Sequence, residues 1–70
     1  MAEHADKLRK ILARLDAAAA ASDMDVPGLR LHRLRGNLKD FWAVTVRANW
    51  RVIFRFEGSD ATDVDYVDYH

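Results

Sequence analysis

The sequence predicts an α+β fold in which one N-terminal helix packs on a twisted antiparallel sheet of three to four strands. Two observations lead to this expectation. The spacing of apolar residues changes from a helical period to strict alternation near residue 29. The chain has 70 residues, which is enough for one hydrophobic core only. We therefore treat residues 1–70 as a single domain.

The amino-acid composition excludes several classes of protein. Half of the residues are hydrophobic and 31% are charged, which is too apolar for a disordered tail and too charged for a membrane span. The chain contains no cysteine, and its first residues do not form the apolar core of a signal peptide. We expect a cytoplasmic protein that does not bind a membrane.

An amphipathic helix is predicted over residues 3–21. Its apolar stripe has the spacing of one helix face and consists of Leu8, Ile11, Leu12, Leu15, Ala18 and Ala19. Charged residues take most of the other positions, and residues 17–21 are all alanine, the residue with the highest helix propensity. Pro27 and two aspartates then predict a loop over residues 22–28.

Four strands are predicted after this loop. A short, weak strand is predicted from Leu29 onward, and the turn-forming residues Gly36 and Asn37 end it. Residues 41–47 and 51–56 are rich in aromatic and β-branched side chains, which indicates two strong strands. The last strand, over residues 62–69, follows a turn that begins with Gly58.

The need for matching apolar faces predicts the register of the two hairpins. The first hairpin places Val46 opposite Val52, Val44 opposite Phe54 and Trp42 opposite Phe56. The second places Phe54 opposite Val64 and Val52 opposite Tyr66. This register gives one apolar face for the helix and leaves the other face wet and mixed in charge.

On the wet face, the predicted register separates paired from unpaired arginines. Arg55 falls opposite Asp63, a pairing that we expect to be structural and worth at most ~1 kcal/mol. Arg47 and Arg51 lie nearer the strand ends and have no acid opposite them. These two arginines are therefore predicted to be free for a ligand.

Charge is distributed unevenly along the chain, although 11 basic and 11 acidic residues give a formal net charge of zero. The segment from residue 30 to residue 55 contains Arg30, Arg33, Arg35, Lys39, Arg47, Arg51 and Arg55 against the single acid Asp40. Four aspartates follow, at positions 60, 63, 65 and 68. The fold could therefore present one cationic surface and one acidic edge.

The three histidines differ in how well the sequence supports a functional role for them. His4 belongs to the first turn of the helix and is expected to be solvated. For His32, the sequence supports two roles equally well, that of an exposed strand residue and that of a functional residue. Asp68 and His70 could share a strand face near His32, but this spacing matches no paired-histidine motif, so we predict no metal site. Scattered glycines and the lack of cysteine also argue against a phosphate loop, a cofactor and a thiol nucleophile.

A basic face edged by a tyrosine and one or two histidines is suited to RNA cleavage without a metal ion. Such cleavage needs a base for the ribose 2′-OH proton, cations for the phosphate charge and an acid for the leaving 5′ oxygen. Imidazole suits both proton transfers, because its unperturbed pKa is ~6.5. A plain RNA-binding or protein-binding β module would explain the same cations.

Four strings favour the nuclease reading: Leu31-His32-Arg33-Leu34-Arg35-Gly36, Phe41-Trp42-Ala43-Val44, Asn49-Trp50-Arg51-Val52-Ile53-Phe54-Arg55-Phe56 and Asp65-Tyr66-Val67-Asp68-Tyr69-His70. In their order and spacing, the sequence resembles the HigB-type toxins, or plasmid maintenance system killer proteins, of the RelE/ParE superfamily. The resemblance implies a type II toxin that cleaves mRNA on the ribosome. It also implies silencing by a helix-turn-helix antitoxin of the HigA type, encoded beside the toxin.

The resemblance also assigns roles to individual residues. The family's active-site histidine falls on His32, its lysine on Arg35 and its proline on Arg33. Its Asn-Trp-Arg arginine falls on Arg51, and its C-terminal acid, tyrosine and histidine fall on Asp68, Tyr69 and His70. An arginine in place of the lysine can hold phosphate but is a weaker proton donor, because guanidinium stays charged.

The implied reaction is attack of the 2′-OH on the adjacent phosphate, giving a cyclic 2′,3′-phosphate and a free 5′-OH. His32 or Asp68 is the candidate base and His70 the candidate acid. Charge would be stabilised by Arg35, Arg51 and Arg47, with Arg33 and Lys39 as further RNA-binding residues. Tyr69 would stack on or orient a base.

One departure from the family pattern lies at the front of the chain, where relatives carry an extra strand and helix. Without them we expect an unpaired edge strand and a partly bare helix-packing face, which predicts self-association, a covering partner or low stability. Two other functions stay open: an inactive module that binds antitoxin or RNA, and a toxin of the same superfamily directed at a protein. Groups for proton transfer, such as His32, argue against the protein-directed toxin.

Overall fold

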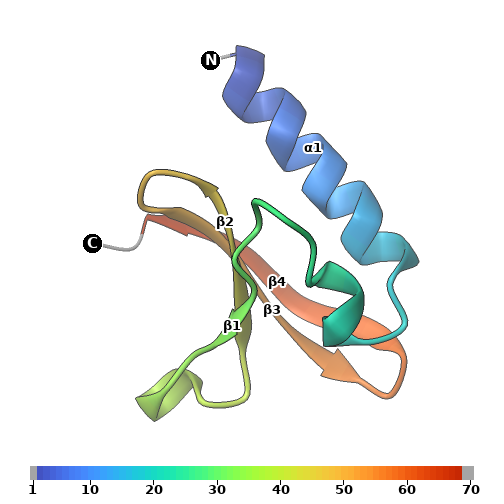
Figure 1. Cartoon of the computed structure of the whole chain (residues 1–70). Coiled ribbons are helices and arrows are strands. Elements are labelled where there is room, and N and C mark those ends of the chain that lie inside the picture. The colour runs from blue at the N-terminus through green and yellow to red at the C-terminus, as the bar shows by residue number, and fades with distance from the viewer. Residues whose placement is uncertain (1, 69–70) are drawn as a thin grey trace.

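A computed structural model describes residues 2–68 and contains one long helix and a four-stranded sheet (Figure 1). The elements in chain order are α1 (Ala2–Ala17), the 3₁₀ helix η1 (Ala21–Met24), β1 (His32–Arg33), the 3₁₀ helix η2 (Gly36–Leu38), β2 (Trp42–Arg47), β3 (Trp50–Glu57) and β4 (Asp60–Asp68). Neighbouring strands are antiparallel in the order β1-β2-β3-β4. The predicted α+β class, with one helix on an antiparallel sheet, is confirmed.

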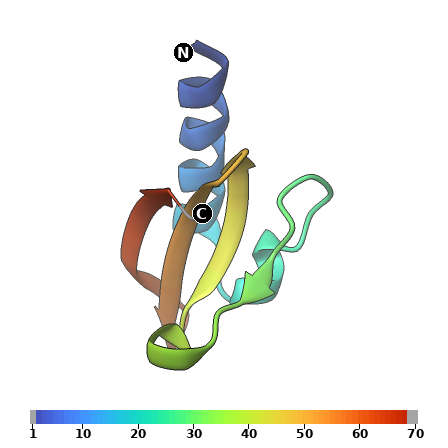
Figure 2. The same cartoon turned by 90° about the vertical axis from the view of Figure 1, so that its left-hand side faces the viewer.

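The helix α1 covers one face of the sheet and lies behind the strands in Figure 2. The main core lies between α1 and this face and contains Ile11, Leu15, Ala18, Met24, Leu29, Val44, Val46, Val52 and Phe54. The apolar face predicted from the strand pattern is therefore the face that the helix covers. No helix within residues 2–68 is long and apolar enough to cross a membrane.

The helix ends at Ala17, four residues before its predicted end. Asp23 explains the early end, because its carboxylate accepts hydrogen bonds from the amides of Ala19 at 2.9 Å and Ala20 at 3.3 Å. These bonds cap the short helix η1, which occupies part of the predicted loop. The turn brings Met24 into the core with none of its surface exposed, a core residue that periodicity alone did not identify.

The predicted register of the β2–β3 hairpin is wrong by two residues. Val52 pairs with Val44 and Phe54 pairs with Trp42. The cause is a two-residue turn, which brings Trp50 into β3 opposite Arg47, together with a bulge between Thr45 and Arg47. A shift of two residues leaves the side chains of residues 42–45 and 51–54 on their predicted faces, because the strand period is two. Arg47 is an exception: it was predicted on the wet face, but beyond the bulge it pairs with Trp50, which packs against the main core.

The β3–β4 register is confirmed at one end and wrong at the other. Val52 pairs with Tyr66 as predicted, but a register shift between Ile53 and Arg55 removes the expected pairing of Phe54 with Val64. Asp63 lies close to this irregularity with φ of 51°, in the left-handed region. Although Arg55 now pairs with Thr62, its Nη1 still lies 3.2 Å from a carboxylate oxygen of Asp63, so the predicted ion pair is present.

The face predicted to be wet contains a second small core. Leu34, Ala43 and Ile53 are buried there, and Leu38, Phe41 and Val67 pack around them. The helix η2 folds the chain back so that the Leu34 amide donates to the Phe41 carbonyl at 3.0 Å. Only part of this face is therefore open to a polar ligand.

Candidate functional site

The strand β1 places His32 at one edge of the sheet. His32 pairs with Ala43 of β2, and just before this pair the Thr45 amide donates to the Leu29 carbonyl at 2.7 Å. The pairing directs the His32 side chain to the face opposite α1, where Ala43 and Ile53 belong to the second core. The His32 ring is exposed beside this small apolar floor.

A backbone contact defines which nitrogen of the His32 ring carries hydrogen. Nδ1 lies 2.8 Å from the carbonyl oxygen of Arg30. A carbonyl can only accept a hydrogen bond, so Nδ1 donates and, in the neutral ring, Nε2 carries the lone pair. This tautomer leaves Nε2 available to take a proton from a ligand.

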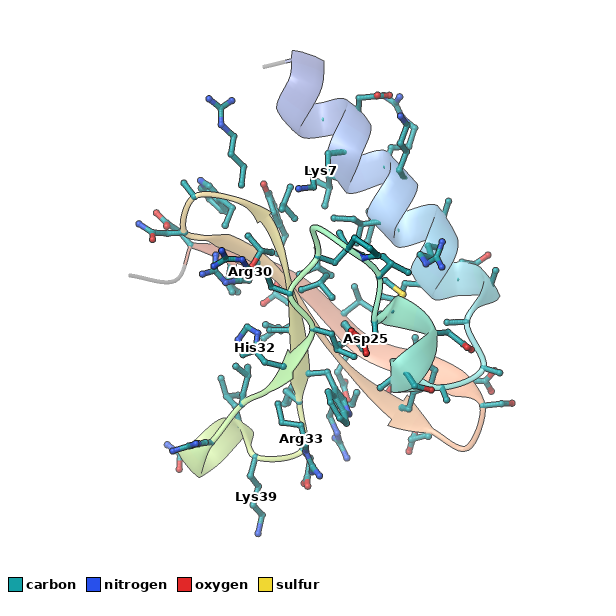
Figure 3. The ribbon with its side chains drawn as sticks, viewed as in Figure 1. Lys7, Asp25, Arg30, His32, Arg33 and Lys39 are labelled. Carbon is teal, nitrogen blue, oxygen red and sulfur yellow. The ribbon has the colours of Figure 1, made fainter. Side chains whose placement is uncertain are left out.

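The carbonyl that holds His32 belongs to a residue with an unusual backbone. Arg30 has φ of 53°, in the left-handed region that is costly for a side chain with a Cβ. Its exposed side chain projects on the same side of the chain as His32 (Figure 3). Sequence reasoning assigned no role to Arg30, although its position two residues before His32 on an alternating segment was the signal.

Arg51 lies on the same sheet face as His32. It pairs with Thr45 and with Val67, one row along from the row that contains His32. Its Nη1 donates to the carbonyl of Ala48 at 2.7 Å and to that of Trp50 at 3.4 Å, whereas its buried Nε has no partner within residues 2–68. The sequence predicted that the Arg51 side chain is free for a ligand. In the structure it is partly engaged, because it also holds the β2–β3 turn.

Arg47 differs from Arg51 in its surroundings. The bulge places it opposite Trp50 at the end of β2, and its side chain is exposed. Within the described part of the chain it makes no hydrogen bond or ion pair. Arg47 is thus an exposed cation beside the turn that Arg51 holds.

The other predicted cations gather around η2. Arg33 lies on the opposite face from His32, with its guanidinium carbon 5.2 Å from the centre of the Trp42 ring. Its Nη2 also donates to the Lys39 carbonyl at 3.2 Å. Arg35 and Lys39 are exposed and flank η2, Arg35 as its N-cap residue and Lys39 as its C-cap residue. Figure 3 shows Arg33 and Lys39 together, away from Arg30.

The predicted catalytic residues at the end of the chain are only partly described. Tyr69 and His70 lie outside the described residues, as does the side chain of His4. Asp68 pairs with Trp50 on β4, the edge of the sheet farthest from β1. Three strand spacings separate these edges by about 14 Å, and the alternation of β4 places Asp68 on the opposite face from His32. The structure does not bring His32 and Asp68 together.

Tyr66 connects this end of β4 to the main core. Its ring stacks on Trp50 with a centroid distance of 4.7 Å. Desolvation of the phenol, and to a smaller extent the charge of Asp68, raise the pKa of Tyr66 above its usual value. The phenol is therefore a hydrogen-bond donor at neutral pH and not a base.

A hollow of about 560 Å³ lies beyond Ile53 on the His32 face, toward the start of β4. Leu38 and Phe41 form its apolar wall, and the Arg55–Asp63 ion pair lies at its rim. The acids of β4 make this end of the face unfavourable for phosphate, in contrast to the end with Arg51 and Arg30. No group of three histidine, aspartate or glutamate residues suited to a metal ion occurs within residues 2–68.

The sequence was compared with known families and proteins. Residues 1–70 match the family described as the RelE-like toxin of the type II toxin-antitoxin system HigB. The chain is 36% identical over 69 residues to the Endoribonuclease HigB of Proteus vulgaris, covering 99% of this chain and 75% of that protein. It is 40% identical over 57 residues to the Toxin HigB-1 of Vibrio cholerae serotype O1, covering 80% of this chain and 59% of that protein. The chain therefore belongs to the HigB-like toxins, the RelE-like toxins of type II toxin-antitoxin systems.

Proposed function

We propose that this chain is an endoribonuclease that cleaves mRNA on the ribosome by attack of the ribose 2′-OH, without a metal ion. Family membership supports a toxin, and the name of the Proteus vulgaris relative supports ribonuclease activity. The observation that carries the proposal is the contact between His32 Nδ1 and the Arg30 carbonyl, which leaves Nε2 exposed as a base beside cationic side chains.

In the proposed reaction, His32 Nε2 takes the proton of the 2′-OH. The 2′ oxygen attacks the adjacent phosphorus and displaces the 5′ oxygen, so that the products are a cyclic 2′,3′-phosphate and a 5′-OH. His70 is the proposed acid for the leaving oxygen, and Tyr69 is proposed to orient a base. Because Asp68 lies on the opposite face from His32, we favour His32 over Asp68 as the base.

Phosphate charge would be shared between two groups of cations. Arg51, on the same face as His32, and Arg30, two residues before His32, would act on the scissile phosphate, and Arg47 would add charge from the end of β2, where it pairs with Trp50. Around η2, Arg35 and Lys39 would hold the flanking backbone of the RNA. Arg33 would add positive charge for the RNA from a fixed position, because its guanidinium group is held over the Trp42 ring.

As a toxin of a type II toxin-antitoxin system, the protein has an antitoxin as partner. We propose that this antitoxin is a helix-turn-helix protein of the HigA type, and that the toxin acts in the cytoplasm as a single domain. Self-association is a further proposal from the exposed apolar residues Leu12 and Val64.

An inactive module that binds RNA or antitoxin is the second candidate. The bonds between Arg51 and the β2–β3 turn favour it, because a residue engaged with the backbone contributes less to a transition state. The two functions differ in whether the RNA is cut.

The test is cleavage of an mRNA in a purified translation system, followed by primer extension. The unchanged chain should cut, and His32→Ala should cut about 100-fold to 10,000-fold more slowly, as expected for loss of a general base. His32→Asn and His32→Gln are controls that keep a polar side chain without a base, and both should be inactive. His70→Ala tests the proposed acid in the same assay.

Circular dichroism should first show that each variant is folded. Full activity of His32→Asn would overturn the assigned base. Binding of ribosomes or antitoxin without any cleavage by the unchanged chain would support the inactive module instead.

A further inference from the structure

The helix α1 has an open flank on the side of the loop between η1 and β1. A hollow of about 260 Å³ lies there between the helix and the loop. Its floor is apolar and consists of Ile11 of α1 together with Val26, Pro27 and Leu29 of the loop. Ile11 and Leu29 are buried, whereas Val26 is half-buried and Pro27 is exposed. The edge of the main core therefore reaches the surface in this hollow.

Basic side chains form the rim of the hollow. Lys7, Lys10 and Arg14 line it from α1, and no acidic residue lines it within the described part of the chain. Lys7 makes no hydrogen bond or ion pair with any described residue, and it extends from α1 toward the loop (Figure 3). Lys10 Nζ lies 3.4 Å from a carboxylate oxygen of Asp6 in an exposed pair, and Arg14 donates from Nε to the Asp23 carbonyl at 3.1 Å. The rim is therefore a basic flank of α1 that can still bind an external anion.

The three cations form a row along the helix. Lys7, Lys10 and Arg14 are three and four residues apart and span about 10 Å of α1. Carboxylates three and four residues apart on a second helix would repeat over the same distance. Leu12 and the open groove that it shares with Val64 lie on the other side of the buried stripe of α1, so the basic flank is a separate surface.

Size and chemistry distinguish between the occupants that this hollow can have. Its volume is below the ~300–1,000 Å³ typical of sites for small molecules, so it fits one large apolar side chain better than a whole ligand. An RNA backbone would use the cations but would leave the apolar floor uncovered. A second copy of α1 would place lysines against lysines, which is unfavourable. A partner with carboxylates around an apolar side chain matches both the rim and the floor.

We propose that the basic flank of α1 binds an acidic amphipathic helix of a partner protein. An apolar side chain of that helix inserts between α1 and the loop, and carboxylates on either side of it pair with Lys7, Lys10 and Arg14. The apolar side chain supplies the buried contact on which affinity depends, and the carboxylates supply specificity. His32 does not line this surface, so the proposal does not depend on the ribonuclease activity.

The experiment titrates the ¹⁵N-labelled chain with synthetic peptides of about 15 residues, which is about four turns of helix. Physiological salt is used, because it screens charges more than ~8 Å apart. The leucine–glutamate peptide carries leucines on one helix face and glutamates beside them. One control peptide contains the same residues in an order that destroys the stripe, and another has the central leucine replaced by alanine. The leucine–glutamate peptide should shift the amide signals of residues 7–14 and 26–29, and each control should bind at least about tenfold more weakly.

Two charge reversals on α1 sharpen the test. Lys7→Glu removes a cation from the rim of the hollow and should weaken binding of the leucine–glutamate peptide about tenfold. Arg9→Glu is the matched control, because Arg9 is an exposed cation of the same helix that does not line the hollow, and it should leave binding nearly unchanged. Arg9 pairs with Asp6 at the surface, so its loss should leave the fold intact. Amide spectra should show that both variants stay folded.

Several results would overturn the proposal. These are no binding of the leucine–glutamate peptide, equal binding of the reordered peptide, signal shifts confined to residues outside α1 and the loop, or equal weakening by Lys7→Glu and Arg9→Glu. A short single-stranded RNA that shifts the same signals at a lower concentration and displaces the peptide would assign the basic flank to nucleic acid. Sedimentation would also decide against the proposal if the chain alone formed dimers that Lys7→Glu disrupts, since a second copy would then be the occupant.

Discussion

The two edges of the sheet differ in almost every physical property. At one edge, β1 has only two paired residues, His32 and Arg33, and the chain on either side turns away through Arg30 and η2. At the other, β4 presents nine residues with aspartates along it and an apolar groove beside it. A chain with no net charge thus carries a basic edge and an acidic edge. The comparison teaches that overall composition conceals surfaces that favour opposite partners.

The β1 edge is also protected against strand addition, whereas β4 is only partly protected. Short length, turns and bulges are devices that prevent edge pairing, and β1 has the first two. β4 has an irregularity at Asp63 and negative charge, which discourage pairing with itself but not with a basic strand. The two edges therefore differ in how readily another strand could pair with them.

The largest expected effect comes from the core that both edges share. Phe54 is fully buried under α1, so Phe54→Ala should lower the free energy of unfolding by ~3–5 kcal/mol and disturb both edges together. Urea denaturation followed by circular dichroism measures this. Phe56→Ala, at a partly buried position, is the control and should cost less. A loss below ~1 kcal/mol for Phe54→Ala would mean that the two edges do not depend on one core.

The next effect separates two arginines on the same strand. Arg51→Ala should weaken binding of a short RNA about tenfold, because it removes a cation near His32 and loosens the β2–β3 turn. Arg55→Ala should change RNA affinity little and stability by less than ~1 kcal/mol, since the Arg55–Asp63 pair is exposed. Fluorescence anisotropy at two salt concentrations measures the affinities. If Arg55→Ala were the more damaging change, the RNA would lie at the acidic end of the face.

A smaller effect tests the backbone strain beside His32. Arg30→Gly keeps the carbonyl that holds His32 and removes the cost of a left-handed non-glycine residue, so stability should rise by ~1 kcal/mol. The same change removes a cation, and RNA affinity should fall a few-fold. Thermal melts and RNA binding of one preparation give both values. A fall in stability would show that the Arg30 side chain is needed for folding.

The smallest effect concerns the pH dependence of the β4 edge. Because the pKa of Tyr66 is raised in the folded chain, the unfolded chain loses its phenol proton first as pH rises. The contribution of Tyr66 to stability should be complete below pH ~10 and decline above it. Melting curves between pH 8 and 11 should therefore fall more steeply for the unchanged chain than for Tyr66→Phe. Identical pH profiles would contradict this account.

The amino-acid pattern was sufficient to predict which elements form and which face of each is buried. The stripe that contains Leu8, Ile11 and Leu15 predicted α1, and alternation predicted the helix-covered face of β2 and β3. The Arg55–Asp63 ion pair was also predictable, because it needs only correct faces and an approximate register. The resemblance to HigB-type toxins, carried by the quoted motifs, agrees with the family match over residues 1–70.

Tertiary structure decided the details on which the two edges depend. A period of two specifies the face of a strand but not a shift by two residues, so the turn and bulges set the hairpin register. The left-handed conformations at Ala48 and Asp63 had no sequence signal, because neither residue is glycine. Met24 and the second core became visible only when η1 and η2 folded back on the sheet.

Local sequence therefore determined the elements of this protein, their buried faces and the residue types available for chemistry, since these follow from periodicity and side-chain properties within a few positions. Long-range packing determined that His32 pairs with Ala43 at one edge of the sheet, that Asp68 lies at the far edge on the other face, and that Leu12 and Val64 share one open groove. These relations join segments distant in the chain. Their geometry depends on hairpin turns, bulges and the crossing of α1 over the sheet, which no local pattern encodes.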